Sequence, residues 1–197
     1  MARPLSEDKQ FALLDAATEL VAQQGVGAPT AQIARQAGVA EGTLFRYFAT
    51  KDELLNQLYL HLKTGLCAAI ANSDVTTGSL KQRTHALWDL YIDWGIAHPL
   101  ASRAMSQLHV SDKIRPETRA QAHAMFPDIS EIVGKVFAGL SAEQSTAFSE
   151  MLLGNLAEAT MNFAANNPAE AQHYKAAGFA FFYGTVCRIF KKPDGAL

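Results

Sequence analysis

The sequence is poor in the features that mark several classes of protein. Among its 197 residues there are only two cysteines, Cys67 and Cys187, and neither has a neighbour at metal-ligand spacing. We therefore expect reduced, packed thiols, as in a protein kept in a reducing compartment. No apolar run approaches the roughly 18 residues that cross a membrane, and the first residues lack the apolar stretch of a secretory signal. These absences predict a cytoplasmic protein without membrane association.

Motifs of catalysis and metal binding are also missing. The six histidines show no i, i+4 pairing, and the sequence contains neither an HExxH motif nor a glycine-rich phosphate loop. No serine, histidine and acidic residue stand at a spacing that indicates nucleophilic catalysis. The sequence predicts no metal site, no cofactor and no enzymatic activity. An enzyme that uses a cavity within a helical bundle is the alternative.

An excess of positive charge, which often marks a nucleic-acid-binding domain, is absent too. Lysine and arginine number 17 against 19 aspartate and glutamate residues, so the formal net charge is −2. The composition, with 49% apolar and 18% charged residues, is that of an ordinary globular protein. Any DNA affinity that does not depend on base sequence should be modest, because phosphate neutralisation supplies most of it.

Apolar periodicity predicts helices throughout and no strand, so the expected fold class is all-α. We expect nine helices, three in an amino-terminal head of residues 1–50 and six in a body of residues 51–197. Their expected ranges are 6–24, 30–37, 40–48, 50 to a polar loop at 72–78, 79–98, 100–109, 116–140, 141–165 and 167–190. Thr50, Ser79 and Ser141 each precede a Glu or Gln by three residues, which predicts capping boxes.

Residues 30 to 54 carry the most informative pattern, two short helical runs joined by a turn at Gly38. A tight turn at this place needs a residue that tolerates positive φ, which glycine does without steric cost. Leu44 and Phe48 stand at i, i+4 on the inner face of the second run. The opposite face is polar and is free to enter the major groove of DNA. The pattern therefore predicts a helix-turn-helix.

This segment resembles the DNA-binding head of the tetracycline-repressor (TetR) family of bacterial transcription regulators. The matching residues are Ile33-Ala34, Ala37-Gly38-Val39, Gly42-Thr43-Leu44-Phe45, Tyr47-Phe48 and Lys51-Asp52-Glu53-Leu54-Leu55. The resemblance covers about residues 10–60, and the body agrees in its pattern of six helices. It implies a homodimeric repressor that binds a palindromic operator and is released by a small-molecule inducer. A transcriptional activator, or a regulator that acts through a partner protein, is the alternative.

The resemblance also implies which residues contact DNA. They are Thr30, Glu41, Gly42, Thr43, Phe45, Arg46, Tyr47 and Lys51. Arg46 is the one basic side chain of the recognition helix and suits guanine or phosphate. Tyr47 and Lys51 suit phosphate, although Tyr47 could instead pack between helices. Thr30, at the start of its helix, is expected to contact phosphate, to cap the helix, or to do both.

Two of these positions depart from the family pattern. Phe45 stands where family members often have a tyrosine, so a hydroxyl that could bind phosphate is lost. Glu41 places an acidic side chain on the face that would meet DNA. Both departures predict a weaker electrostatic attraction to the phosphate backbone, in agreement with the low net charge of the whole chain.

The last helix, predicted to begin at Asn167-Pro168, is apolar around most of its circumference. Such a helix must be buried on more than one side, and a four-helix bundle with a second copy of the chain achieves that. We therefore predict a homodimer through the eighth and ninth helices. The predicted contact residues are Phe179, Phe182, Tyr183 and Val186. The alternative is that the last helix lies at the centre of a monomer core.

The body is predicted to hold a ligand pocket lined by an aromatic strip at i, i+3, i+6. The strip consists of Trp88, Tyr91 and Trp94. The residues that could complete the pocket are Met105, His109, Phe126, Phe137 and Met151. Ordinary core packing is the alternative for each of them. Asn155, Glu158 and Asn162 share one stripe of an apolar helix and need partners if buried, either in a ligand or across the dimer.

Overall fold

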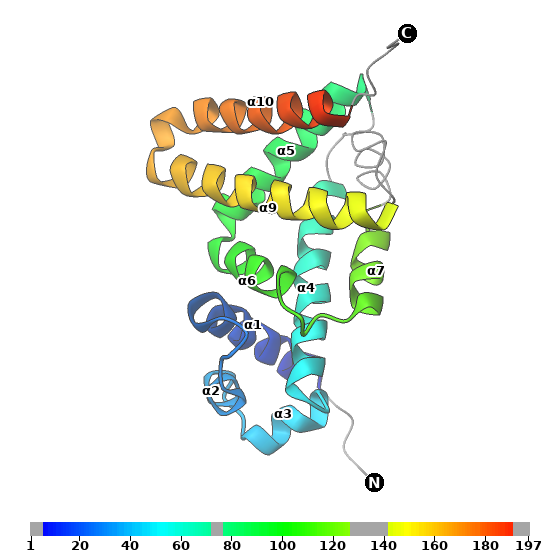
Figure 1. The fold of residues 1–197 in the computed structure, drawn as a ribbon. Coiled ribbons are helices and arrows are strands. Elements are labelled where there is room, and N and C mark those ends of the chain that lie inside the picture. Colours follow the sequence, from blue (N-terminus) through cyan, green and yellow to red (C-terminus); the bar gives the residue numbers. More distant parts are fainter. Residues whose placement is uncertain (1–5, 72–76, 127–141, 191–197) are drawn as a thin grey trace. The chain divides into compact units, whose positions relative to one another are not determined.

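The computed structural model describes residues 6–71, 77–126 and 142–190, with the side chains of 151–184 in the last range. The described residues form helices, turns and loops and no strand (Figure 1). The helices are α1 (Glu7–Gln24), α2 (Thr30–Gln36), α3 (Glu41–Tyr47), α4 (Lys51–Ala71), α5 (Leu80–Ala97), α6 (Pro99–His109), α7 (Pro116–Ala124), α9 (Ala142–Asn166) and α10 (Ala171–Phe190). The prediction of an all-α fold with an amino-terminal helix-turn-helix is confirmed.

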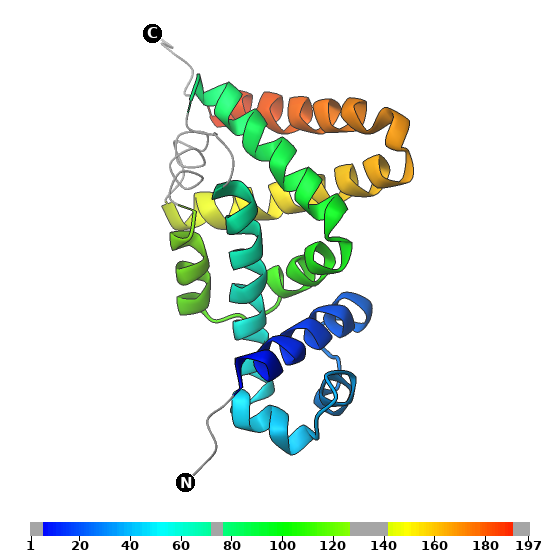
Figure 2. The same cartoon turned by 180° about the vertical axis from the view of Figure 1, so that it is seen from behind.

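The chain divides into two compact units, each with its own core. Unit 1 consists of Met1–Gly65 and His98–Met125, and unit 2 of Leu66–Ala97 and Phe126–Leu197. Within unit 1, α1 packs against α2 and α6, and α2 packs against α3. Within unit 2, α9 and α10 run side by side in opposite directions and α5 packs against both (Figure 1 and Figure 2).

The core of unit 1 fixes the orientation of α3. The large side chains that are fully buried here are Leu13, Val21, Ile33, Leu44, Phe48, Leu54, Leu55, Leu58, Tyr59 and Leu108. Leu44 and Phe48 belong to this set, as their i, i+4 spacing predicts. Burial of each such side chain contributes about 1.5–3 kcal/mol, so rotating α3 about its axis would be costly. Its opposite face is therefore held outward.

Hydrogen bonds confirm two of the predicted helix starts. The Glu53 N–H donates to Thr50 Oγ1 over 3.0 Å at the start of α4. At α5, the Ser79 N–H donates to Gln82 Oε1 over 2.9 Å and the Gln82 N–H donates to Ser79 Oγ over 3.4 Å. This reciprocal pair of bonds is a capping box. The box predicted at Ser141 lies outside the described residues.

The prediction of one helix over residues 116–140 is wrong in its length. α7 ends at Ala124, and the Met125 N–H donates to the Ala122 carbonyl over 3.3 Å in the turn that follows. Pro127 accounts for this end, because the α conformation is sterically disfavoured for the residue before a proline, here Phe126. Phe137, predicted to line the pocket, lies outside the described residues.

The last helix begins later than predicted. Pro168–Glu170 form one turn of 3-10 helix, and α10 starts at Ala171. The Asn167 side chain caps neither element but donates its amide to the Phe163 carbonyl over 3.0 Å. The same carbonyl, at the end of α9, also accepts a hydrogen bond from the Asn167 N–H over 3.1 Å.

Unit 2 is built around Trp88 of α5. Its ring packs with Ile92, Ala157, Met161 and Phe179 in a cluster contributed by α5, α9 and α10. Its indole Nε1 donates to the carbonyl of Lys175 over 2.9 Å. Trp88, one of the residues predicted to line a pocket, is therefore buried in the core of unit 2, and its contact with a ligand stays a prediction.

Candidate nucleic-acid interface

The turn of the helix-turn-helix is formed at Gly38, as predicted. Gly38 has φ of 71° in the left-handed region, which a residue with a Cβ enters at a cost of about 1–2 kcal/mol. The turn is closed by backbone bonds from Gly38 N–H to the Arg35 carbonyl and from Val39 N–H to the Ala34 carbonyl. This geometry joins α2 and α3, which pack against each other.

The outer face of α3 is open to solvent. Glu41, Gly42, Phe45 and Arg46 are exposed, whereas Thr43 is half-buried. Phe45 keeps 42% of its surface exposed, although burying a phenylalanine is favourable by about 1.5–3 kcal/mol. This face therefore offers one aromatic, one cationic and one anionic side chain to a partner.

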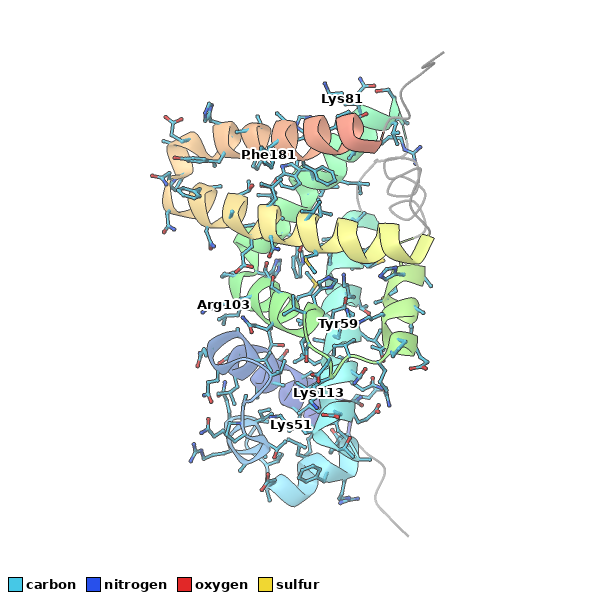
Figure 3. The ribbon with its side chains drawn as sticks, viewed as in Figure 1. Lys51, Tyr59, Lys81, Arg103, Lys113 and Phe181 are labelled. Carbon is cyan, nitrogen blue, oxygen red and sulfur yellow. The ribbon has the colours of Figure 1, made fainter. Side chains whose placement is uncertain are left out.

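Tyr47 and Lys51 flank this face. The Tyr47 hydroxyl accepts a hydrogen bond from the Ser6 N–H over 3.0 Å, and its side chain is half-buried beside Phe48. Because a phenol that accepts one bond can still donate its own proton, Tyr47 combines packing with the capacity to bind a phosphate oxygen. Lys51 is the first residue of α4 (Figure 3).

Thr30 does not cap α2, contrary to one of the two roles predicted for it. Pro29 occupies the N-cap position and no side chain caps this helix. Instead, Thr30 Oγ1 donates to Glu41 Oε1 over 2.6 Å, and both side chains lie at the surface of unit 1. In this arrangement the Thr30 hydroxyl proton is not available to a phosphate.

We compared the chain with known protein families and solved structures. The family model described as bacterial regulatory proteins, tetR family, matches residues 13–58, which contain the helix-turn-helix. A solved structure of a protein from Shewanella sp. PV-4, assigned to the TetR family of transcription regulators, is 32% identical to this chain. That alignment covers 90% of this chain and 97% of the Shewanella chain, with a TM-score of 0.73. The chain belongs to the TetR family.

Two further proteins are similar to this chain. A helix-turn-helix-type transcriptional repressor of Mycobacterium tuberculosis is 31% identical over 114 residues, which are 56% of this chain. The match spans 61% of the length of that relative. LfrR of Mycobacterium smegmatis, solved in complex with proflavine, shares the fold at 21% identity, with 89% and 95% of the two chains covered and a TM-score of 0.62.

The residues predicted to line a pocket of this TetR-family chain fall in both units. In unit 2, Trp88 and Trp94 are buried and Tyr91 is half-buried in the core. In unit 1, Met105 is buried, and His109 Nδ1 lies 3.3 Å from the Tyr59 hydroxyl. The other members are Phe126, which is half-buried, and Met151, which is exposed. A pocket that these residues share stays a prediction.

The predicted dimer interface lies on α9 and α10, and the structure shows which of their side chains are exposed. Phe179 and Phe182 are buried within unit 2 against α5, and the side chain of Val186 lies outside those described. The large apolar side chains that are exposed are Met151, Leu152 and Phe163 of α9 and Phe181 of α10. The predicted polar stripe is exposed on α9 as well, and it consists of Asn155, Glu158 and Asn162. Among the helices of the described ranges, none is long and apolar enough to cross a membrane.

Sequence reasoning missed Asn56, a buried polar residue of α4 behind the helix-turn-helix. Its amide nitrogen donates to the carbonyls of Asp52 and Lys113 over 2.7 and 2.8 Å. Its amide oxygen accepts from the Arg115 N–H over 3.0 Å. Asn56 therefore fastens the segment before α7 to α4. One asparagine among Leu54, Leu55 and Leu58 was the available signal.

Proposed function

We propose that this TetR-family chain is a transcriptional repressor that binds a palindromic operator as a homodimer and releases it when a small molecule binds. In this proposal residues 1–50 form the DNA-binding domain, and residues 51–197 form the domain for dimerisation and ligand binding. The observation that carries the proposal is the outer face of α3, held outward because Leu44 and Phe48 are fully buried on the other side.

In this proposal α3 enters the major groove. Arg46, exposed on α3, contacts a guanine or a phosphate, and Lys51 neutralises a phosphate from the start of α4. Gly42 and Thr43 approach base edges, while the Tyr47 hydroxyl donates to a phosphate oxygen. Phe45 contacts a thymine methyl group, which suits an exposed aromatic ring better than phosphate does.

The exposed faces of α9 and α10 support a two-fold dimer. Phe163 and Phe181 keep 59% and 67% of their surfaces exposed in the single chain, which is unfavourable in water. A second copy would cover them and would bring Asn155 and Asn162 to the same interface, where they could form hydrogen bonds. Two heads related by a two-fold axis fit an operator with two equivalent half-sites.

A small-molecule ligand would act from the body. LfrR, which shares this fold, was solved with proflavine, and this supports a ligand for the present chain without identifying it. A ligand bound in the body releases DNA if it binds more tightly to a dimer whose heads no longer fit successive major grooves. The aromatic residues Trp88, Tyr91 and Trp94 are the proposed source of contacts.

DNA binding by the full chain can be measured by fluorescence anisotropy on the DNA upstream of its own gene. Arg46→Ala should cost roughly 1–3 kcal/mol on the cognate operator and relax specificity at one position per half-site. Lys51→Ala should weaken binding to all sequences alike and reduce the salt slope by about one. Arg103→Ala, which removes an exposed arginine of α6 outside the helix-turn-helix, is the control (Figure 3). Equal affinities for all four proteins would refute the proposed interface.

A further inference from the structure

Glu41 is an acidic residue in a place where acid opposes DNA binding. It is the first residue of α3 and is exposed on the same face as Arg46. Within the described part of the chain its carboxylate forms no ion pair, and its hydrogen bond comes from the uncharged hydroxyl of Thr30. A carboxylate that is not neutralised repels the phosphate backbone, so it lowers affinity for every sequence. It can favour binding only where it gains a specific contact.

The bond from Thr30 prepares Glu41 for such a contact. Its length of 2.6 Å lies in the range of about 2.5–2.7 Å that is typical of a hydroxyl bound to an ionised carboxylate. Thr30 is on α2 and Glu41 is on α3, so the bond spans the turn and restricts the rotamers of a long, flexible side chain. One oxygen is held by this bond while the other can still accept. A side chain that is ordered before binding loses less conformational entropy when it binds.

The chemistry of the base edges selects the partner. An ionised carboxylate has no proton to donate, so in the major groove it can pair only with an amino group. Guanine and thymine present acceptors there, whereas cytosine and adenine present amino donors. Adenine also places the N7 acceptor beside its amino group, and this acceptor would repel the carboxylate. Cytosine presents the N4 amino group without an acceptor on the same base.

We propose that Glu41, held by Thr30, recognises one cytosine in each operator half-site by accepting a hydrogen bond from its N4 amino group. The proposal rests on the proposed function, in which α3 enters the major groove. It explains why an acid is present on this face, and it assigns Thr30 a role as the residue that positions Glu41. Glu41 is then a determinant of sequence specificity that lowers general DNA affinity.

The test is selection of binding sites from a random duplex library by the full chain and by Glu41→Gln. Glutamine has nearly the same shape, but its amide donates and accepts and therefore matches the N6 and N7 edge of adenine. The wild-type consensus should contain one cytosine per half-site, preferred over thymine by about 5- to 150-fold. In Glu41→Gln this preference should shift to adenine at the same position, and all other positions should be unchanged.

Two further variants separate recognition from a purely structural bond. Thr30→Val keeps the branched shape but removes the hydroxyl, so the cytosine preference should weaken while the other preferences persist. Glu19→Gln is the matched control, because Glu19 is an exposed acid of α1 that accepts a bond from Gln36 of α2 but does not lie on the recognition helix. Its consensus should equal that of the wild type.

The outcomes distinguish this inference from the proposed function beneath it. If the wild-type chain selects no consensus at all, the proposed DNA-binding function itself is refuted. If wild type selects a consensus and Glu41→Gln selects the same one, base recognition by Glu41 is refuted while the proposed function stands. A uniform loss of affinity in Glu41→Gln and Thr30→Val, with all base preferences kept, would show that the hydrogen bond from Thr30 to Glu41 only stabilises the packing of α2 and α3.

Discussion

Gly178 of α10 lies so close to Trp88 of α5 that no side chain fits between them. A Cβ on Gly178 would lie 2.7 Å from Trp88 Cζ2 and 2.5 Å from Thr160 Oγ1 of α9. Helices α5, α9 and α10 therefore meet at one point, next to the hydrogen bond from the Trp88 indole to the Lys175 carbonyl. Close approach of backbone is the reason that glycine is required here.

The first prediction is that Gly178→Ala destabilises the protein. The added methyl group must displace Trp88 or Thr160, and overpacking of this kind costs about 1–3 kcal/mol. Gly65→Ala is the control, because nothing lies within 4 Å of a Cβ at this exposed position of α4, and alanine should gain up to about 1 kcal/mol there. Urea unfolding followed by circular dichroism measures both. Equal stability of the two variants would contradict the close contact.

The head of the molecule could be predicted from sequence because its signals are local. Gly38 marks the turn, Thr50 with Glu53 marks a helix start, and the spacing of Leu44 to Phe48 marks the inner face. Each signal spans only a few residues and needs no knowledge of the tertiary structure. The same holds in the body for the helix start at Ser79.

The faces of α9 and α10 could not be predicted in this way. Phe181 and Phe182 are neighbours in a helix that is apolar almost all round, so periodicity does not distinguish them. Only packing against α5 decides that Phe182 is buried and Phe181 is exposed. Likewise, the bond from Thr30 to Glu41 joins residues on two helices and leaves no pattern in the sequence.

The second prediction uses this difference between the two phenylalanines. Phe181→Glu should yield a folded monomer, because the side chain is exposed in the single chain and would be buried only by a second copy (Figure 3). Phe182→Glu should unfold unit 2, because an unpaired acid would replace a ring that is 6% exposed in the core. Sedimentation and circular dichroism on both variants test this. A dimeric Phe181→Glu protein would exclude this position from the interface.

The third prediction concerns Asn56, which is 1% exposed. Asn56→Ala leaves the Lys113 carbonyl and the Arg115 N–H without their partner, and each buried polar group left unsatisfied costs about 1–3 kcal/mol. Gln121→Ala, a change at an exposed position of α7, should alter stability by no more than about 0.5 kcal/mol. Hydrogen exchange adds a local readout, since the Arg115 amide should lose protection in Asn56→Ala alone. Unchanged protection there would contradict the assigned bond.

The fourth prediction concerns the dependence of stability on pH at Glu53. The hydrogen bond from Gln57 Nε2, at 3.1 Å, is the largest cause that lowers the pKa of the Glu53 carboxyl below its ordinary value of 4.5. Partial burial opposes this shift, and the guanidinium of Arg115, at 2.9 Å, adds to the lowering through its hydrogen bond and its charge. The folded protein therefore binds this proton less readily than the unfolded chain does.

A carboxyl whose pKa is lowered by folding stabilises the protein fully above its unfolded pKa, and this contribution is lost as the pH falls through the folded pKa. The gap in unfolding free energy between wild type and Glu53→Gln should therefore be largest near neutral pH and should shrink below about pH 4.5. Urea unfolding at several pH values measures the gap. Repeating it in an Arg115→Gln background should give a smaller gap at neutral pH, because one of the causes of the shift has been removed. If the gap between wild type and Glu53→Gln stayed constant with pH while Arg115 is present, Glu53 would stabilise the fold by packing rather than by its charge.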